Sequence, residues 1–203
     1  MKEKFIKSTL ILIIGGFLTK LLGMLIKIVM ARAIGTKVLG TYMLILPTFS
    51  LLISLSQFGL PVALSKLISE ERRNTKKLFF TILPLLITIN ILLSILIVIT
   101  APIISKKLLH NKSTYLAILA MSLVIPFTST SSICRSYFFG KSKMFPHVLS
   151  NIIEDITRLL LLIITLPKIT IYGTKYTVAY LILINIISEI TSTIILIFFL
   201  PKI

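Results

Sequence analysis

Long apolar runs separated by short polar segments make up almost the whole chain. A helix needs about 20 mostly apolar residues to cross a lipid bilayer, and each of these runs is long enough. The alternation of a membrane β-strand is missing, and unpaired backbone groups in hydrocarbon are too costly, so the runs must be helices. We therefore predict an all-α integral membrane protein with about six transmembrane helices. The predicted spans are residues 9–33, 42–68, 78–104, 115–139, 148–166 and 178–200.

The composition leaves no room for a separate soluble domain. Of the 203 residues, 56% are hydrophobic and 14% are charged, and the mean hydropathy is +1.05. Six spans with short connections use nearly all of this length, so we predict a single six-helix transmembrane lobe over residues 1–203. The net charge of +16 does not indicate nucleic acid, because the basic residues are dispersed among the apolar runs.

The lysines and arginines of the connections predict the orientation, because they are more numerous on the cytoplasmic side. With the amino terminus inside, the cytoplasmic segments hold Lys2, Lys4, Lys7, Arg72, Arg73, Lys76, Lys77, Lys141, Lys143 and Lys202. The outer segments then hold Lys37, Lys106, Lys107, Lys112, Lys168 and Lys175. This excess predicts a multi-pass protein of the cell membrane with a cytoplasmic amino terminus.

Ionisable residues also occur inside the apolar runs, where each one costs about 2.5 to 3.5 kcal/mol at the bilayer centre. They are Lys20, Lys27 and Arg32 in the first run, Lys66 in the second, Arg135 in the fourth, Glu154, Asp155 and Arg158 in the fifth, and Glu189 in the sixth. Such residues usually face a partner helix or a water-filled cavity, so they are the candidate functional residues.

In the first span, small and cationic residues share one face. Gly16, Lys20, Gly23, Lys27 and Ala31 follow one another at intervals of about one helical turn, which places them in one stripe. We expect this stripe to line a cavity or pack closely, with Gly16 and Gly23 as packing positions. The alternative for the two lysines is that their long side chains extend to the membrane interface.

In the fifth span, Glu154 and Arg158 are four residues apart in the favourable order, so we predict that they pair on one helix face. Glu189 has no partner within its own predicted helix. It is therefore either protonated or paired with a cation on another helix, and the lysines of the first span are the natural candidates.

Cations outnumber acids within the spans, so an inward-facing arrangement would form a positive chamber that attracts anions. A lipid-linked sugar diphosphate is such an anion, and its tail could remain in the membrane lipid while its head group crosses. Pro61 is a candidate hinge, because a proline removes a backbone donor and tends to bend a helix.

Motifs for enzymatic chemistry are missing. The sequence contains no phosphate-binding glycine loop, no zinc-ligand spacing and no nucleophile elbow, and Cys134 is its only cysteine. We therefore predict no enzyme, no cofactor and no metal site. Uphill transport would then depend on an ion gradient or on the membrane potential.

Several segments carry a family resemblance. TKLLG at 19–23, ARAIG at 31–35 and GTY at 40–42 resemble the first-span signature of the stage V sporulation protein B family. QFGLPVALSK at 57–66 resembles that family's second span and RSYFFG at 135–140 its fourth. Ile153 and Glu154, with Arg158, resemble its fifth span.

The family is similar to polysaccharide exporters, to lipid II flippases and, more distantly, to multidrug and toxic compound extrusion transporters. The resemblance implies two six-helix lobes that alternate access to a central cavity and move a wall precursor during spore cortex formation. Lipid II flippases carry an arginine and an aspartate where this chain has Ile26 and Lys27, and paired arginines where it has Leu51 and Leu52. These residues of lipid II flippases have no counterpart in this chain.

The chain length corresponds to one lobe, so we expect a truncated product, a split-gene product, or a subunit that pairs with a second lobe or a second copy. The first functional hypothesis is a flippase lobe for a lipid-linked oligosaccharide or peptidoglycan precursor. In it Lys20 and Lys27 contact the diphosphate, and Glu189 couples transport through protonation or ion pairing. A drug or cation exporter of the related fold would favour acidic cavity residues. The third hypothesis is a membrane scaffold or inactive fragment, in which the charged residues tolerate neutral replacement.

Overall fold

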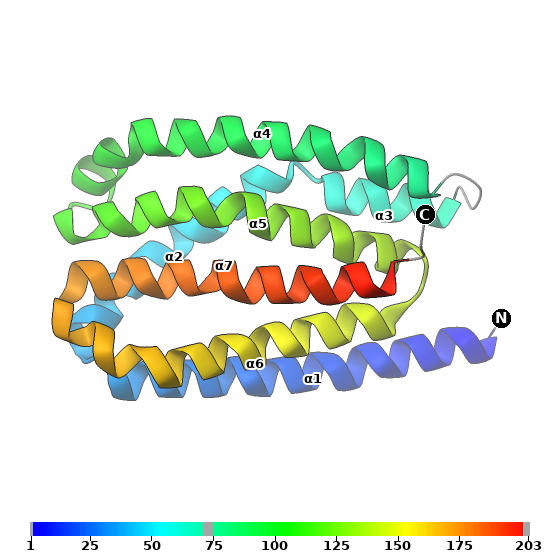
Figure 1. Cartoon of the computed structure of the whole chain (residues 1–203), viewed down its shortest axis with the longest axis horizontal. Coiled ribbons are helices and arrows are strands. Elements are labelled where there is room, and N and C mark those ends of the chain that lie inside the picture. The colour runs from blue at the N-terminus through cyan, green and yellow to red at the C-terminus, as the bar shows by residue number, and fades with distance from the viewer. Residues whose placement is uncertain (1, 71–74, 201–203) are drawn as a thin grey trace.

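The computed structural model describes residues 2–70 and 75–200, and these residues are almost entirely helical, without a β-strand (Figure 1). The helices are α1 (Lys2–Ala33), α2 (Thr36–Gln57), α3 (Leu60–Glu70), α4 (Thr75–Ile103), α5 (Tyr115–Gly140), α6 (Met144–Ile169) and α7 (Thr174–Phe199). Three short helices lie in the connections: η1 (Ile104–Leu108), η2 (Lys112–Thr114) and η3 (Thr170–Tyr172). Arg72, Arg73 and Lys202, which contributed to the predicted orientation, lie outside the described residues.

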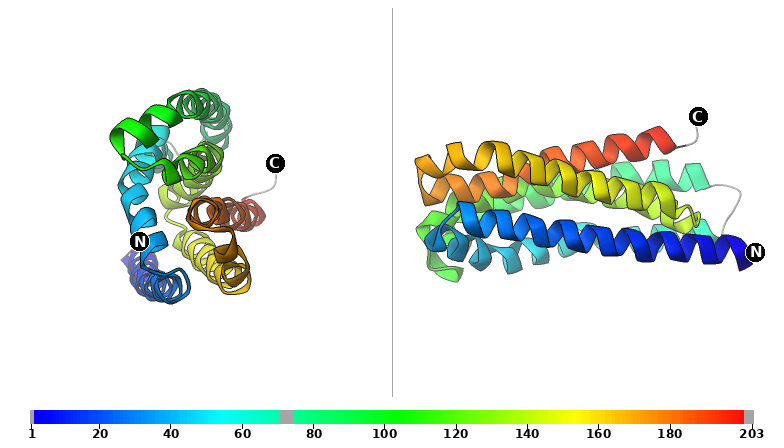
Figure 2. Two further views of the ribbon diagram at one scale, coloured as in Figure 1. Left: turned by 90° about the vertical axis from the view of Figure 1, so that its left-hand side faces the viewer. Right: turned by 90° about the horizontal axis from the view of Figure 1, so that it is seen from below.

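The long helices form a bundle in which the chain passes back and forth along one axis (Figure 1). α1 begins and α7 ends at the same end of the bundle, as an even number of crossings requires. The view along the axis shows α5 at the centre, with α4 and α7 beside it and α1 paired with α6 (Figure 2). α2 crosses the bundle obliquely from α1 towards α4 (Figure 1).

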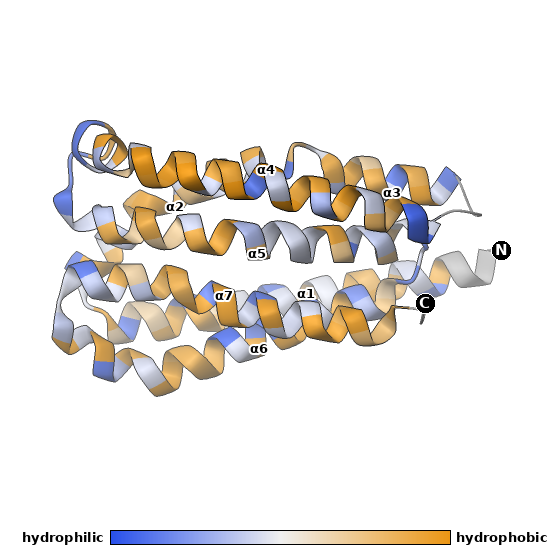
Figure 3. Ribbon diagram, turned by 45° about the horizontal axis from the view of Figure 1, so that its top comes forward, coloured by the Kyte–Doolittle hydropathy of each residue, from blue (hydrophilic) through white to orange (hydrophobic). Residues whose placement is uncertain are grey.

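The outer surface of the bundle is apolar, as expected when lipid is the solvent (Figure 3). Large side chains such as Phe17, Val62 and Phe198 are exposed, and hydrophilic residues occur at both ends of the bundle as well as part-way along several helices. Within the described residues, five stretches of helix are long and apolar enough to cross a membrane, in α1, α2, α4, α5 and α7. α6 is 26 residues long but contains Glu154, Asp155 and Arg158. The prediction of an all-α membrane protein is confirmed.

The predicted second span, residues 42–68, is wrong as a single helix. It is divided between α2 and α3 at Phe58 and Gly59, whose φ angles of 47° and 69° are left-handed and cannot continue an α-helix. Gly59 adopts this conformation without steric cost. Pro61, the predicted hinge, lies just after the break in the first turn of α3, where its missing N–H needs no helical acceptor.

Buried polar side chains hold the broken end of α2 in place. The Asn90 amide of α4 donates to the Ser56 carbonyl oxygen at 3.2 Å, a backbone group that lost its helical partner at the break. Ser129 of α5 donates to Asn90 Oδ1 at 2.9 Å, and Gln57 donates to Ser132 at 3.0 Å. The break is therefore fixed by hydrogen bonds to two neighbouring helices.

Glycines allow two close helix contacts. A Cβ on Gly140 would lie 2.6 Å from the Ser65 carbonyl oxygen, so α3 packs directly on the α5 backbone. A Cβ on Gly15 would lie 2.1 Å from a methyl group of Val148, so α1 packs equally closely on α6. The predicted packing glycines, Gly16 and Gly23, would have nothing within 4 Å of an added Cβ.

Candidate functional site

Three helices contribute charged side chains to one buried network. The Arg135 guanidinium of α5 donates through one nitrogen, Nη2, to Glu154 of α6 and, at 3.0 Å, to Glu189 of α7. Arg158 donates to the other Glu154 oxygen at 2.6 Å. Glu154 therefore accepts from two arginines, and the network ties α5, α6 and α7 together. We call Arg135, Glu154, Asp155, Arg158 and Glu189 the ion network.

The members of the ion network are largely removed from solvent. The side chains of Glu154 and Glu189 are 10% and 8% exposed, and those of Arg135 and Arg158 are 19% and 25% exposed. Asp155 lies at the edge, 3.5 Å from Arg158, and the Ser192 hydroxyl accepts a further hydrogen bond from Arg135 at 3.0 Å. Charge-assisted bonds of this kind are about twice as strong as neutral ones, so they stabilise charges placed within the spans.

Helix geometry explains part of this arrangement. Glu154 and Arg158 are one turn apart on α6, and the predicted pair between them is present. The partner of Glu189 differs from expectation, because it is Arg135 and not a lysine of α1. α7 packs directly on α5, so the arginine of α5 is the cation that lies within reach of Glu189.

A pocket of about 390 Å³ lies on one side of the ion network, between α1, α2, α6 and α7. We call it the large pocket. Its walls are mainly apolar, with Ile26, Met30, Leu162 and Ile184 among them. Charged and polar side chains from four helices line it as well: Lys27, Arg158, Tyr42 and Asn185. The large pocket thus combines two cationic side chains with a mainly apolar wall.

A second pocket of about 230 Å³ lies between α3, α5 and α6, and we call it the small pocket. It is lined by Pro61, Val62, Ser65, Arg135, Ser136, Phe139 and His147. Arg135 belongs to this pocket and Arg158 to the large one, so the ion network has one arginine in each pocket. The buried nitrogens Arg135 Nε, Arg158 Nε and His147 Nδ1 make no hydrogen bond among the described residues.

The predicted site residues fall into two groups. Arg135, Glu154, Arg158 and Glu189 come together in the ion network, and Lys27 joins Arg158 at the large pocket. Lys20 is exposed on α1 and lines neither pocket. Lys66 is exposed on α3, where it lies 4.0 Å from Glu70.

Sequence reasoning missed the uncharged polar residues of the site. Asn185 lies one turn before Glu189 on α7, and this spacing in an otherwise apolar run could have indicated a shared polar face. Tyr42 and His147 carry no comparable local signal, because their place at the pockets depends on how α2 and α6 pack.

The apolar bundle and its buried charges define an all-α, multi-pass membrane protein whose spans are joined by ion pairs. A family model described as "Polysaccharide biosynthesis protein" matches residues 5–202. The chain belongs to this family. The stage V sporulation resemblance drawn from the motifs is also confirmed by the relatives described next.

Three relatives from Bacillus subtilis (strain 168) are similar to this chain. Stage V sporulation protein B is 36% identical over 88% of the chain, and Sporulation protein YkvU is 28% identical over 79%. Lipid II flippase MurJ is 20% identical over 80% of the chain. The chain spans about a third of these relatives, with 35%, 36% and 32% of their lengths covered. No solved structure matches it.

Proposed function

We propose that this chain forms one lobe of a flippase for an anionic lipid-linked oligosaccharide or peptidoglycan precursor in the cytoplasmic membrane, serving spore cortex or cell-wall synthesis. The large pocket is the observation that carries the proposal. It has the volume of a small-molecule site, and its cationic and apolar lining suits a ligand that has both an anionic group and an apolar part. A relative that is named a lipid II flippase supports the general class.

The diphosphate of the substrate binds to Lys27 and Arg158 in this proposal. Both cations line the large pocket from opposite helices, α1 and α6, and both can donate charge-assisted hydrogen bonds to phosphate oxygens. Asn185 and Tyr42 offer neutral hydrogen-bonding groups for the sugar, while the apolar wall receives the start of the lipid tail.

Lys20 acts earlier on the same path. It lies two turns before Lys27 on the same stripe of α1, which is open along Gly16 and Gly23. The opposite wall of the cavity comes from a second lobe or a second copy of this chain. The amino terminus faces the cytoplasm, as the distribution of lysines and arginines predicts.

The proposal is tested by native mass spectrometry of the purified chain with undecaprenyl diphosphate, and with undecaprenol as the neutral counterpart. We expect the chain to retain the diphosphate in preference to the alcohol. Lys27→Gln should weaken retention about tenfold, the loss of one charge-assisted contact of about 1.5 kcal/mol, and Lys20→Gln should weaken it less.

Lys107→Gln is the matched control, because Lys107 is exposed in η1, which contributes no residue to the large pocket. It should leave retention unchanged. Equal retention by wild type and Lys27→Gln, or equal retention of diphosphate and alcohol, would contradict the assignment and favour the membrane scaffold. The same spectra report whether a second copy is bound.

A further inference from the structure

Two carboxylates of the ion network meet at a single nitrogen. Glu154 Oε2 and Glu189 Oε2 both accept from Nη2 of Arg135. The other oxygen of Glu154 is bound by Arg158, whereas Arg135 is the charged partner of Glu189 among the described residues. Like charges that share one site resist simultaneous ionisation, and a proton shared between them relieves the repulsion.

The charges of the ion network do not balance. Its two guanidiniums face three carboxylates, so the fully ionised network has one negative charge in excess. The neighbouring helices offer little compensation at Glu189. Lys27 of α1 and Tyr42 of α2 face Arg158 across the large pocket, and His147 of α6 lies with Arg135 at the small pocket. An uncompensated charge in a buried network is strongly unfavourable.

We propose that Glu154 and Glu189 together bind one proton, which exchanges with solvent through the small pocket. The shared proton removes the excess charge and leaves both arginines paired. The proton belongs to the pair and not to either residue, because both carboxylates accept from the same nitrogen.

The small pocket supplies the route for exchange. Arg135 lines it, so the nitrogen that binds both carboxylates belongs to a side chain in contact with this space. His147, also in the lining, has a buried nitrogen that makes no hydrogen bond among the described residues and that can accept one from water. Ser65 and Ser136 add hydroxyl groups to the same walls.

The proton site of Glu154 and Glu189 is argued from contacts within this chain. A role of the proton in driving transport rests on the proposed flippase function. Arg158 couples the two, because it binds Glu154 and also lines the large pocket. A diphosphate that draws Arg158 away from Glu154 would change how strongly the pair holds its proton. Uptake or release of that proton would then accompany substrate binding.

Infrared spectroscopy of the purified chain in dodecyl maltoside, a detergent without carbonyl groups, tests the proton site, because protonated carboxyl groups have their own carbonyl band. The sequence contains only six Asp and Glu residues, so few groups contribute. Exposed carboxyls are ionised at neutral pH. We expect one protonated carboxyl per chain at neutral pH, and a band that shifts in heavy water because the proton exchanges with solvent.

Replacement of either member should remove the band, since the remaining carboxylate then has Arg135 to itself. Glu189→Gln and Glu154→Gln are the test variants, and Glu70→Gln is the control, because Glu70 is exposed on α3. Helical circular dichroism verifies that each variant is folded. The proposal that the two glutamates share a proton would be overturned if the band remained in both test variants. It would also be overturned if Asp155→Asn removed the band while both test variants kept it.

The wild-type spectrum is decisive even if a variant does not fold. Absence of a protonated carboxyl at neutral pH would refute the proton site, whatever the transport activity. Failure of the chain to retain undecaprenyl diphosphate would refute the proposed substrate and leave the proton site intact. The two proposals therefore fail separately.

Discussion

Glu154 is the residue that connects most of the buried charge. Both of its oxygens accept from arginines, one on its own helix and one on α5. Glu189 accepts from Arg135, which has Glu154 as a second partner. The two glutamates are similarly buried, but Glu154 pairs with two arginines and Glu189 with one.

We expect Glu154→Gln to destabilise the protein more than Glu189→Gln. Loss of Glu154 deprives two arginines of their shared partner, and breaking a buried ion pair in this way costs about 3 to 5 kcal/mol. Loss of Glu189 leaves both arginines paired with Glu154. Thermal unfolding in detergent, followed by circular dichroism, measures the difference, and equal midpoints would contradict it.

The sequence predicts individual residues only where their partners are local. Four-residue spacing was enough to pair Glu154 with Arg158, because both lie on one helix. The partner of Glu189 depends on the packing of α7 on α5, which no periodicity within α7 encodes. Likewise, the mid-span position of Lys20 indicated a cavity, but the neighbours of α1 decide which of its faces is covered.

At the scale of elements, adjacent glycines in α1 have opposite surroundings. Gly15 faces Val148 of α6 in direct contact, whereas Gly16 faces open space. Alanine at position 15 would overpack the interface, at a cost of about 1 to 3 kcal/mol, because the branched Val148 side chain cannot easily move away.

We therefore expect Gly15→Ala to lower the unfolding temperature and Gly16→Ala to leave it unchanged or raise it, since alanine favours a helix by about 1 kcal/mol over glycine. The measurement is the same thermal melt on both single variants. If Gly16→Ala proved the more harmful, Gly16 would be the packing position in the assembled protein, as the small-residue stripe predicts.

Hydropathy predicts where most helices begin and end. The exception is the division of the predicted span 42–68 into α2 and α3. Residues 42–68 are apolar on both sides of the break, so a hydropathy pattern continues through Phe58 and Gly59 without interruption. The break depends on left-handed backbone angles and on Asn90 and Ser129, which come from α4 and α5. Contacts distant in sequence thus determine where α2 ends.

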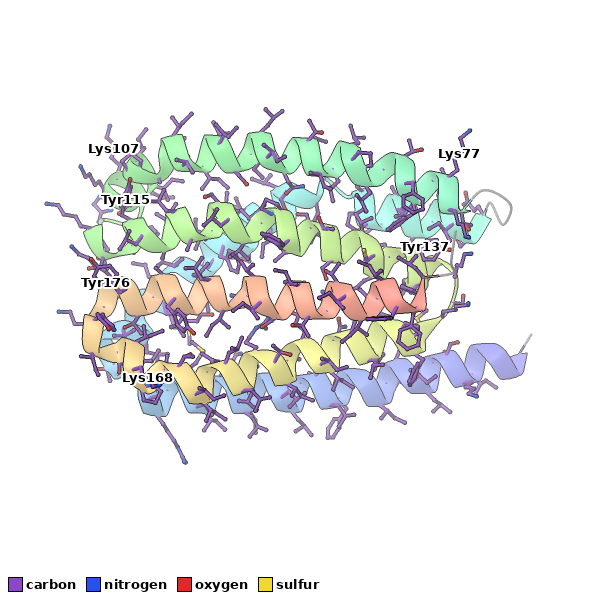
Figure 4. All side chains as sticks on the ribbon, in the orientation of Figure 1. Lys77, Lys107, Tyr115, Tyr137, Lys168 and Tyr176 are labelled. Atoms are coloured by element: carbon purple, nitrogen blue, oxygen red, sulfur yellow. The ribbon has the colours of Figure 1, made fainter. Side chains whose placement is uncertain are left out.

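At the scale of the whole molecule, the two ends of the bundle can be distinguished experimentally. Lys77 lies at the end where α1 begins, and Lys107 lies at the opposite end (Figure 4). Cys134 is buried and is the only cysteine, so Cys134→Ser provides a background without other thiols.

In that background we expect Lys107→Cys to react with a membrane-impermeant maleimide in intact cells. Lys77→Cys should react only after the cells are opened, because the predicted orientation places it in the cytoplasm. Gel-shift labelling of the two variants measures this. The reverse pattern would show that the amino terminus lies outside.

The ion network also has a consequence for biosynthesis. A lone α6 would bring three charged residues into the membrane, at about 2.5 to 3.5 kcal/mol each, and its own pairings neutralise only part of that charge. Arg135 arrives earlier, on α5, and Glu189 arrives later, on α7. α6 should therefore remain beside the insertion machinery until α7 has been synthesised, so that α5, α6 and α7 enter the lipid as one unit.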